Sequence, residues 1–329
     1  RLTALGHLML DRVIEVDRAV DIRTAVDPVM LEIFNNMFMS IAEQMGTALT
    51  NTAYSVNIKE RRDFSCALFD PDGQLVANAP HQPVHLGSMG ESIAAIIRSR
   101  RLTMKPGQVY MLNAPYNGGT HLPDVTVVRP VFDAVGKEVI FYVGARAHHA
   151  DIGGLTPGSV PPNSQVVEEE GVLIDNFLVV EEGILRERET RKLFASGDYP
   201  SRNVDQNIGD LTAQIAACEK GVQELQNMTR HYGLDVVQAY MGHVQDNAEE
   251  LVRKVLSTLR GGNFTYPLDS GAEIRVRIEV DHATRSATID FTGTSPQQAN
   301  NFNAPTAVCK AAVLYVFRTL VDEDIPLNG

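Results

Sequence analysis

Cysteine is scarce in this sequence, and the cysteines it has are far apart. The chain has three, Cys66, Cys218 and Cys309, which is an odd number without a disulfide framework or zinc-finger spacing. Isolated thiols of this kind are typical of buried side chains in a reducing cytosol, so we predict a cytoplasmic protein. No apolar run reaches the length of a membrane span, and we expect no membrane partner.

Positive charge is also scarce. The sequence has 29 Lys and Arg against 41 Asp and Glu, a formal net charge of −12 at pH 7, and its pI is about 5.2. A protein that binds nucleic acid needs a dense basic patch, which argues against nucleic acid as a partner. P-loop, Rossmann glycine and G-x-S-x-G motifs are absent, so we expect this chain alone to show no ATPase activity.

The remaining composition is that of a globular protein. The 329 residues are 44% hydrophobic and 21% charged, which suits one large domain or two ordinary ones. The first residue is not methionine and the last residues form a turn, so we expect a piece of a longer polypeptide. We divide it into a linker or N-terminal arm at 1–26, an α+β region with the metal site at 27–196, and a helical and β region, incomplete at its C-terminus, at 197–329.

Short strands joined by turns predict an α+β fold, with antiparallel sheets, long helices and a metal site on loops and strand ends. N-caps and apolar residues at helical spacing predict helices at 27–51, 88–101, 203–231, 235–259 and 304–321. Alternating apolar residues predict strands at 109–113, 125–132, 138–147, 272–280 and 286–292. A tight turn at 70–73 predicts a further hairpin, whereas the apolar runs LIDNFLVV and GILRER are expected to lead into a helix.

The segment 113–154 carries the residues best suited to chemistry. It reads NAPYNGGTHLPD, then two apolar runs, then ARAHHADIGG, and it contains side chains that divalent metals prefer. Leu122 precedes Pro123, which favours an extended or polyproline conformation. With about three residues per turn in that conformation, His121 and Asp124 share a side, whereas in a regular strand they would face opposite ways.

The run 138–149 alternates as a strand does, so its two histidines diverge. Arg146 and His148 lie on one face, while His149 continues the apolar face as a core residue or a support for the ligands. A single histidine is more often a hydrogen-bonded core residue. His-x-x-Asp together with His-His-x-Asp, which ends at Asp151, favours a metal instead.

Three other positions are open to two interpretations. Asp63 stands where a polar run meets a strand, and it is either a turn residue or a ligand. Glu169 lies in a run of three glutamates after a loop rich in Gly, Pro and Ser; such a run is a solvated face or supplies an acid or base. His85 precedes a predicted helix, and we hypothesise that His85 or Glu169 moves a proton during catalysis.

Several long motifs in one order resemble the hydantoinase B family. They are SVNIKERRDFSCALFDPDGQLVANAPHQPVHLGSM, NAPYNGGTHLPD, ARAHHADIGGLTPGSVPP, NIGDLTAQIAA and VDEDIPLNG, and they extend over 27–329. The family comprises B subunits or domains of N-methylhydantoinases and 5-oxoprolinases, and alpha subunits of acetone and acetophenone carboxylases. Its members are longer, so the chain resembles the N-terminal portion of one. Residues 1–26 are similar to the segment that joins an A domain to a B domain.

The resemblance implies a metal-dependent activity. One divalent ion, Zn²⁺ or Mn²⁺, is implied at Asp63, His121, Asp124 and His148, with His149 and Asp151 beside it. One departure concerns Ala114, where the family usually has aspartate, so a role for a carboxylate at that position is in doubt.

The resemblance also implies a partner. An A-type subunit or domain would bind ATP and Mg²⁺ and phosphorylate the carbonyl oxygen, which makes a hetero-oligomer the expected assembly. The B part would then open a cyclic amide such as 5-oxoproline or a hydantoin. HHAD and THLPD resemble this hydrolase branch. The alternatives are the alpha subunit of a ketone carboxylase, or a scaffold subunit with a structural metal. The sequence leaves the substrate, the metal and the fused or separate state of the partner open.

Overall fold

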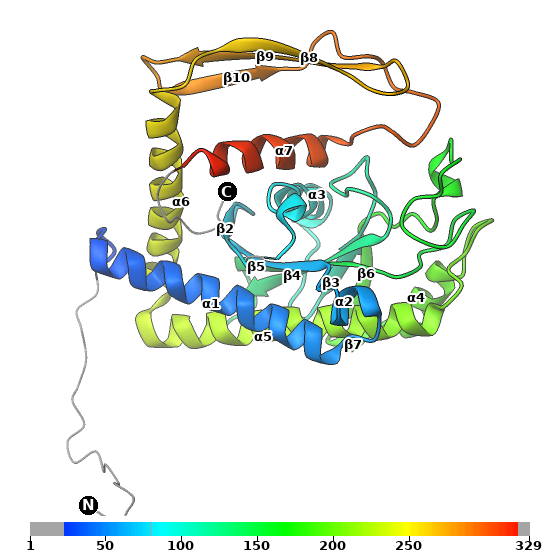
Figure 1. Ribbon diagram of the computed structural model, residues 1–329. Coiled ribbons are helices and arrows are strands. Elements are labelled where there is room, and N and C mark those ends of the chain that lie inside the picture. The colour runs from blue at the N-terminus through cyan, green and yellow to red at the C-terminus, as the bar shows by residue number, and fades with distance from the viewer. Residues whose placement is uncertain (1–22, 80, 322–329) are drawn as a thin grey trace, which may run out of the picture.

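The computed structural model describes residues 23–79 and 81–321, so most of the predicted arm at 1–26 lies outside the described residues. Figure 1 shows the elements in layers. A small sheet lies at the top, followed by α7 (Thr306–Thr319), α3 (Met89–Arg100), a large sheet, and the pair α1 (Pro28–Thr52) and α5 (Val204–Tyr232). The long helix α6 (Leu234–Leu256) runs along one side and connects the α5 layer to the small sheet.

The large sheet has seven strands in the order β2-β1-β5-β4-β3-β6-β7. Every pair is antiparallel, which confirms the α+β fold class. The strands are β1 (Phe64–Phe69), β2 (Leu75–Asn78), β3 (Val109–Leu112), β4 (Asp124–Phe132), β5 (Val139–His148), β6 (Phe177–Glu181) and β7 (Ile184–Leu185). The β6–β7 hairpin contains the two apolar runs that were predicted to lead into a helix, and they do so, because α4 (Glu187–Phe194) begins two residues after β7.

Helices cover the two faces of the large sheet, and a separate hydrophobic core fills each side. Phe141, Val143 and Ala145 of β5 belong to the core against α1 and α5, whereas Tyr142 belongs to the core against α3. The predicted alternation is therefore confirmed from Phe141 onward. Val139 and Ile140 pack on the faces opposite to those predicted, next to a register shift in β4 between Val131 and Phe132. Helix α1 begins as predicted, because the Asp27 carboxylate accepts the N–H of Met30 at 2.9 Å.

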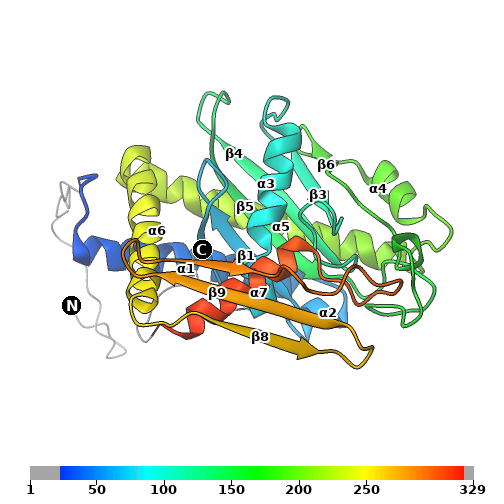
Figure 2. The same ribbon diagram turned by 90° about the horizontal axis from the view of Figure 1, so that it is seen from above.

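The small sheet has the strand order β10-β9-β8 and is antiparallel. Its strands are β8 (Gly262–Pro267), β9 (Glu273–Asp281) and β10 (Ser286–Asp290). Figure 2 shows α7 lying along this sheet. On its other side α7 approaches Gly87, where an added Cβ would lie 2.6 Å from the Ala311 Cα. Only a glycine permits this contact. Strand β8 was not predicted, because its glycine and proline weaken the strand pattern.

Four short helical elements complete the described chain. They are α2 (Val56–Lys59), η1 (Pro83–His85), η2 (Val167–Glu169) and α4 (Glu187–Phe194). The division at residue 197 stays a prediction, and one hydrophobic core extends across it from Phe34 to Val244. In the described part of the chain, no helix is both long and apolar enough to cross a membrane.

His81 is packed where protonation is unfavourable. Its ring lies 4.6 Å from that of Phe64, measured between centroids. It also fills a notch at Gly46, where an added Cβ would come within 2.5 Å of the ring. The buried Nδ1 has no hydrogen-bond partner. Burial, with the nearby His85 and Arg62, lowers the pKa of His81 from 6.5 to about 4.

We predict that His81 makes the protein less stable in acid. The unfolded chain binds a proton at this residue near pH 6.5 and the folded chain does so near pH 4. The free energy of unfolding therefore falls by about 3 kcal/mol as the pH falls from about 6.5 to about 4. Free energies of unfolding from pH 7 to 4 should show a shallower loss for His81→Phe. His231→Gln, on an exposed histidine, should keep the original slope. Identical slopes for all three proteins would contradict the prediction.

Candidate metal centre

Three adjacent strands of the large sheet bring the predicted ligands to one end. The pairing of β4 with β5 sets Asp124 directly opposite His148. Strand β1 pairs with the other side of β5 and begins one residue after Asp63. The N–H of His148 also donates to the Asp63 carbonyl at 3.0 Å. Residues distant in the sequence therefore meet because of sheet register.

His121 reaches the same place through a turn. The N–H of Asp124 donates to the His121 carbonyl at 3.1 Å, which closes a four-residue turn. The two side chains share a side as predicted, with the His121 Nδ1 3.1 Å from the Asp124 Oδ2. The reason was wrong, since the segment forms this turn and not a polyproline run. A second constraint is Gly119, where an added Cβ would lie 2.2 Å from the Asn113 carbonyl oxygen.

His121, Asp124 and His148 form a cluster with metal-ligand character. One ligand atom from each lies within 4.8 Å of the others. The His148 Nδ1 lies 3.4 Å from Oδ1 of Asp124 and 3.8 Å from Oδ2 of Asp63. The opposite nitrogen of His148 lies 2.8 Å from the Ser159 hydroxyl, so Nδ1 is the atom left to face the carboxylates. Asp63 lies at the rim with a side chain 33% exposed.

The carboxylate of Asp124 shows that the cluster fits a divalent ion. Its Oδ2 is satisfied by the Thr120 hydroxyl at 2.9 Å and by His85 Nε2 at 3.2 Å. Its Oδ1 is buried and has no hydrogen-bond partner. Buried carboxylate oxygens are normally paired, so this oxygen is available to a cation. Two carboxylates and two imidazoles suit Zn²⁺ and Mn²⁺ alike.

Hydrogen bonds and charges keep Asp124 ionised. Burial alone would raise the pKa of this carboxyl, but the nearby rings of His121, His148 and His85 hold its pKa well below the usual range. Burial would likewise lower the pKa of His121, but the hydrogen bond to Asp124 and its charge raise it above the ordinary value. A metal would therefore compete with a proton at His121, and its binding should strengthen as the pH rises.

The two predicted catalytic residues have different surroundings. His85 is buried, with Nδ1 3.0 Å from the Ser65 hydroxyl and Nε2 3.2 Å from Asp124, so its ring holds the ligand in place. Glu169 accepts the N–H of Gln165 at 2.7 Å and caps its own loop. These contacts favour a supporting role for both side chains, and their catalytic role stays a prediction.

The two residues predicted to lie beside the ligands hold neighbouring segments. Asp151 forms an ion pair with Arg202 at 2.8 Å, which joins the loop after β5 to the segment before α5. His149 is buried against α5, with Nε2 3.0 Å from the Gln214 side-chain oxygen and Nδ1 3.1 Å from the Asn207 amide nitrogen. The backbone N–H of His149 donates to the Pro123 carbonyl at 2.9 Å. His149 thus braces the turn that carries His121.

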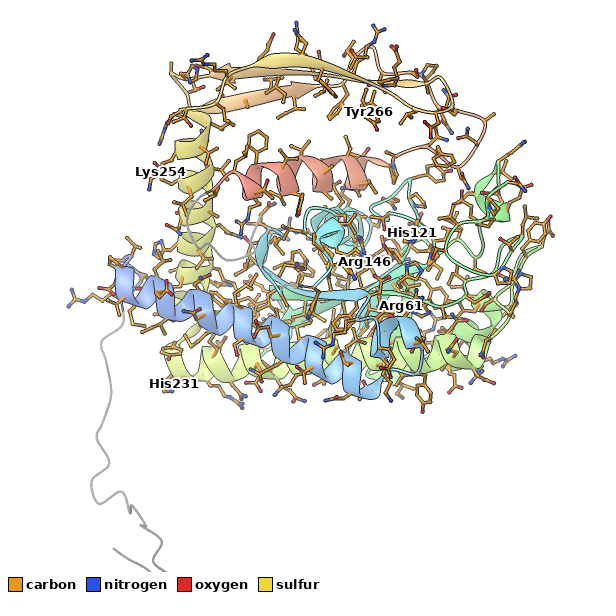
Figure 3. All side chains as sticks on the ribbon, in the orientation of Figure 1. Arg61, His121, Arg146, His231, Lys254 and Tyr266 are labelled. Carbon is orange, nitrogen blue, oxygen red and sulfur yellow. The ribbon has the colours of Figure 1, made fainter. Side chains whose placement is uncertain are left out.

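Arg146 is a further functional candidate. The sequence pattern placed it on the same strand face as His148 but gave it no role. It is fully buried, and its guanidinium donates to the hydroxyls of Thr126 (2.8 Å), Ser88 (2.5 Å) and Ser92 (2.8 Å). The Ser92 hydroxyl donates in turn to the Gly118 carbonyl at 2.6 Å. In Figure 3, Arg146 and His121 both lie close to α3. The arginine thereby joins β4, β5, α3 and the glycine turn. Its position two residues before His148, on the same face of the strand, was the sequence signal that could have identified it.

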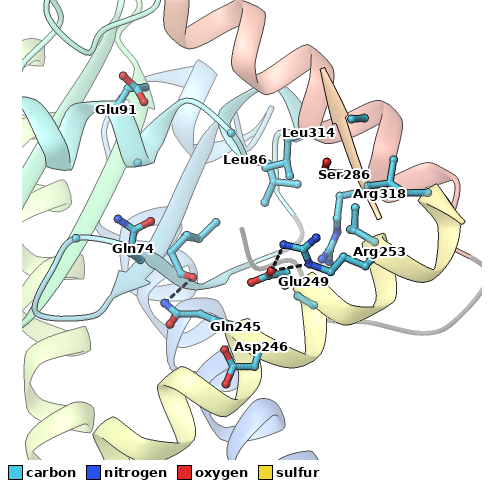
Figure 4. Close-up of a pocket in the computed structure, with 18 of the residues that line it drawn as sticks. Gln74, Leu86, Glu91, Gln245, Asp246, Glu249, Arg253, Ser286, Leu314 and Arg318 are labelled. Atoms are coloured by element: carbon cyan, nitrogen blue, oxygen red, sulfur yellow. Dashed lines mark hydrogen bonds and ion pairs between the residues drawn. The ribbon is translucent and has the colours of Figure 1, made fainter. Parts of the chain in front are cut away.

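A cavity of about 560 Å³ adjoins the cluster and is lined by Thr120, His121 and Glu170, among others. A larger cavity, about 790 Å³, lies between α3, α6 and α7 (Figure 4). None of the predicted ligands lines the larger cavity. Its Arg253 already forms an ion pair, with Glu249 at 2.6 Å. The smaller cavity is therefore the one that a substrate of the centre would occupy.

Comparison with known proteins identifies the family of the chain. Residues 27–329 match the family described as hydantoinase B/oxoprolinase. The chain belongs to this family. It is 49% identical to a 5-oxoprolinase of Saccharomyces cerevisiae, over 92% of this chain and 24% of the yeast protein. It is 47% identical to 5-oxoprolinase 1 of Arabidopsis thaliana, over 92% of this chain and 26% of the plant protein. The chain thus spans about a quarter of the length of these curated relatives.

A solved structure shares the fold. The ATP-dependent caprolactamase of Pseudomonas jessenii superposes with a TM-score of 0.80 at 24% identity. The match covers 93% of this chain and 52% of the caprolactamase chain. The hydantoinase B/oxoprolinase chain described here therefore has a fold already seen in a longer protein.

Asn113 provides a test of the turn that carries His121. Its buried amide donates to the carbonyls of Leu122 (2.8 Å) and Val172 (3.0 Å) and accepts the N–H of Ile174 (2.7 Å). We predict that Asn113→Ala lowers the free energy of unfolding by about 3–5 kcal/mol, because three backbone groups lose their partners. Denaturant unfolding measures this. The control Asn117→Ala loses two exposed contacts, with Asp175 and Arg98, and should cost less than about 1 kcal/mol. Equal losses would contradict the prediction.

Proposed function

We propose that this chain is the B-type part of an ATP-dependent enzyme that opens a cyclic amide such as 5-oxoproline or a hydantoin. The observation that carries the proposal is the buried His121–Asp124–His148 cluster beside the 560 Å³ cavity. The 49% identity of the chain to a yeast 5-oxoprolinase supports the same reaction. ATP and Mg²⁺ are assigned to an A-type subunit or domain beyond the residues described.

The chemistry requires activation because a ring amide is a poor electrophile. The A-type part transfers the γ-phosphoryl group of ATP to the ring carbonyl oxygen, and ADP leaves. One water adds to that carbon, the C–N bond breaks, and the nitrogen keeps the electron pair and takes a proton. This step leaves an amine and an acyl phosphate. A second water releases phosphate and leaves a carboxylate.

Four side chains would hold one divalent ion for this reaction: Asp63, His121, Asp124 and His148. When bound, such an ion lowers the pKa of water toward ~7. Ser159 fixes the ring of His148, while His85 and Thr120 hold Asp124 by its other oxygen. These contacts hold His148 and Asp124 in one orientation before substrate binds.

Glu170 is the carboxyl group best placed to give a proton to the ring nitrogen. It lines the same cavity as His121, whereas Glu169 is used in its own loop. Partial burial raises the pKa of Glu170, against the lowering effect of the Ser164 hydroxyl 3.4 Å away. A raised pKa enlarges the protonated fraction near neutral pH, as a general acid requires.

Metal content tests the first part of the proposal. Full-length protein purified without chelator should contain about one Zn²⁺ or Mn²⁺ per chain. His121→Ala should lose most of it, because a ligand is removed from a site with few others. His231→Ala is the matched control, since this histidine is exposed and lies far from the cluster in Figure 3. A protein without stoichiometric metal, or unchanged content after His121→Ala, would make these residues polar core residues.

Turnover tests the second part. The full-length protein with ATP and its A-type part should convert 5-oxoproline or a hydantoin to the ring-opened amino acid, with release of ADP and phosphate. Glu170→Gln should lower kcat by roughly 10²–10⁴ while metal content stays unchanged, because only the proton donor is lost. Glu168→Gln is the control, on an exposed neighbour. Glu169→Gln compares the two carboxylates directly.

Other outcomes would assign the chain elsewhere. Carboxylated ketone from bicarbonate and ketone, without ring opening, would identify a ketone carboxylase. Ring opening that survives loss of all four ligand side chains would remove the metal from the mechanism. Metal content without any turnover, together with binding of the A-type part, would favour a scaffold.

A further inference from the structure

The cavity beside His121 is built from parts of the chain that are far apart in sequence. Its walls come from α3, the loops at 115–121 and 160–170, and the segment 297–307. The Asn301 side-chain nitrogen donates to the Pro161 carbonyl at 2.6 Å and lies 3.2 Å from the Ser164 hydroxyl. These contacts join the last wall to the loop that carries Glu170. The cavity is therefore a formed part of the fold.

The cavity wall carries one cation that no carboxylate neutralises. Its charged lining residues are Glu91, Arg98 and Glu170, with His121 at one end. Glu91 forms an ion pair with Lys310 at 2.5 Å. Within residues 23–79 and 81–321, no carboxylate forms an ion pair with Arg98, and its guanidinium donates to Asn117 Oδ1 at 3.4 Å. Arg98 is an exposed residue at the cavity wall, and most of its guanidinium donors are not used by other residues of the described chain.

The rest of the lining suits a small ring amide. Side-chain amides, which both donate and accept hydrogen bonds, come from Gln165, Gln297, Asn300, Asn301 and Asn303. Apolar surface for ring methylene groups comes from Tyr116, Val160, Val166, Ala304 and Pro305. A volume of about 560 Å³ is ample for a five-membered ring with one substituent.

We propose that Arg98 determines substrate specificity by binding a carboxylate attached to the ring amide. This inference rests on the proposed function and narrows its substrate class to carboxylated lactams such as 5-oxoproline. A guanidinium binds a carboxylate through two parallel hydrogen bonds, which also orients the ring. With the carboxylate at Arg98, the amide bond would share the cavity with His121 of the cluster and with the carboxyl of Glu170. A neutral lactam leaves Arg98 unpaired.

Two substrates that differ only in the carboxylate test this proposal. The full-length protein with its A-type part should prefer 5-oxoproline to 2-pyrrolidinone. Arg98→Gln should lower kcat/KM for 5-oxoproline by roughly 10–100-fold, mainly through KM, and change 2-pyrrolidinone by less than about twofold. Arg98→Lys should recover part of the loss. Arg101→Gln removes the same charge from an exposed residue outside the cavity lining and should change neither substrate.

Each outcome has one meaning. Equal effects of Arg98→Gln on the two substrates, or no preference for 5-oxoproline in the unaltered protein, would overturn the proposal while ring opening stands. If the protein opens no ring amide, the proposed function fails. Calorimetric measurement of 5-oxoproline binding then decides whether the role of Arg98 still stands. Binding weakened at least tenfold by Arg98→Gln supports the role of Arg98 although the proposed function fails. Unaffected or absent binding overturns both.

Discussion

The antiparallel pairing of β4 with β5 is the constraint on which the candidate centre depends. Its register sets Asp124 opposite His148, and the pairing of β1 with β5 brings Asp63 to the same end. Side chains alternate between the two faces, so a slip of one residue would replace His148 by His149. The same slip would move Arg146 into the apolar core against α1 and α5, where its guanidinium would have no hydroxyl partners. The cost of burying that cation opposes the wrong register.

Polar residues on both faces of β5 then stiffen the end of the sheet. On one face Arg146 connects β4, α3 and the glycine turn through hydroxyl groups. On the other face Gln214 donates to the carbonyls of Val125 and Ala145, at 2.8 and 2.9 Å, and accepts from His149. Such hydrogen bonds are strong in a low-dielectric interior, and unsatisfied ones are costly there. The ligands are thereby held in place before any ion or substrate binds.

The parts of this arrangement that depend on local pattern were predictable from the sequence. Period-two alternation separated His148 from His149, and capping chemistry located the start of α1 at Asp27. Asp63 was left open by its surroundings and became a candidate through family resemblance. Glu170 contacts Ser164, which Asn301 also contacts from a distant part of the chain, and no local pattern encodes that packing. Arg146 was placed on the correct face, but its three hydroxyl partners lie on elements that only the folded chain brings together.

The burial of the ligands increases from one side of the centre to the other, and this asymmetry sets the direction of approach. The side chain of Asp124 is 4% exposed and that of His148 is 10% exposed, against 32% for His121 and 33% for Asp63. Arg146 and the sheet close the deep side, so a substrate would reach the cluster from the side of His121 and Asp63. His121 is also the ligand that lines the cavity with Arg98 and Glu170. A ring amide entering there would present its reactive bond to the cluster while its substituents contact the cavity wall. Under the proposed function the fold would separate two tasks: strand register would hold the ligands, and the cavity loops, which are distant in sequence, would select the substrate.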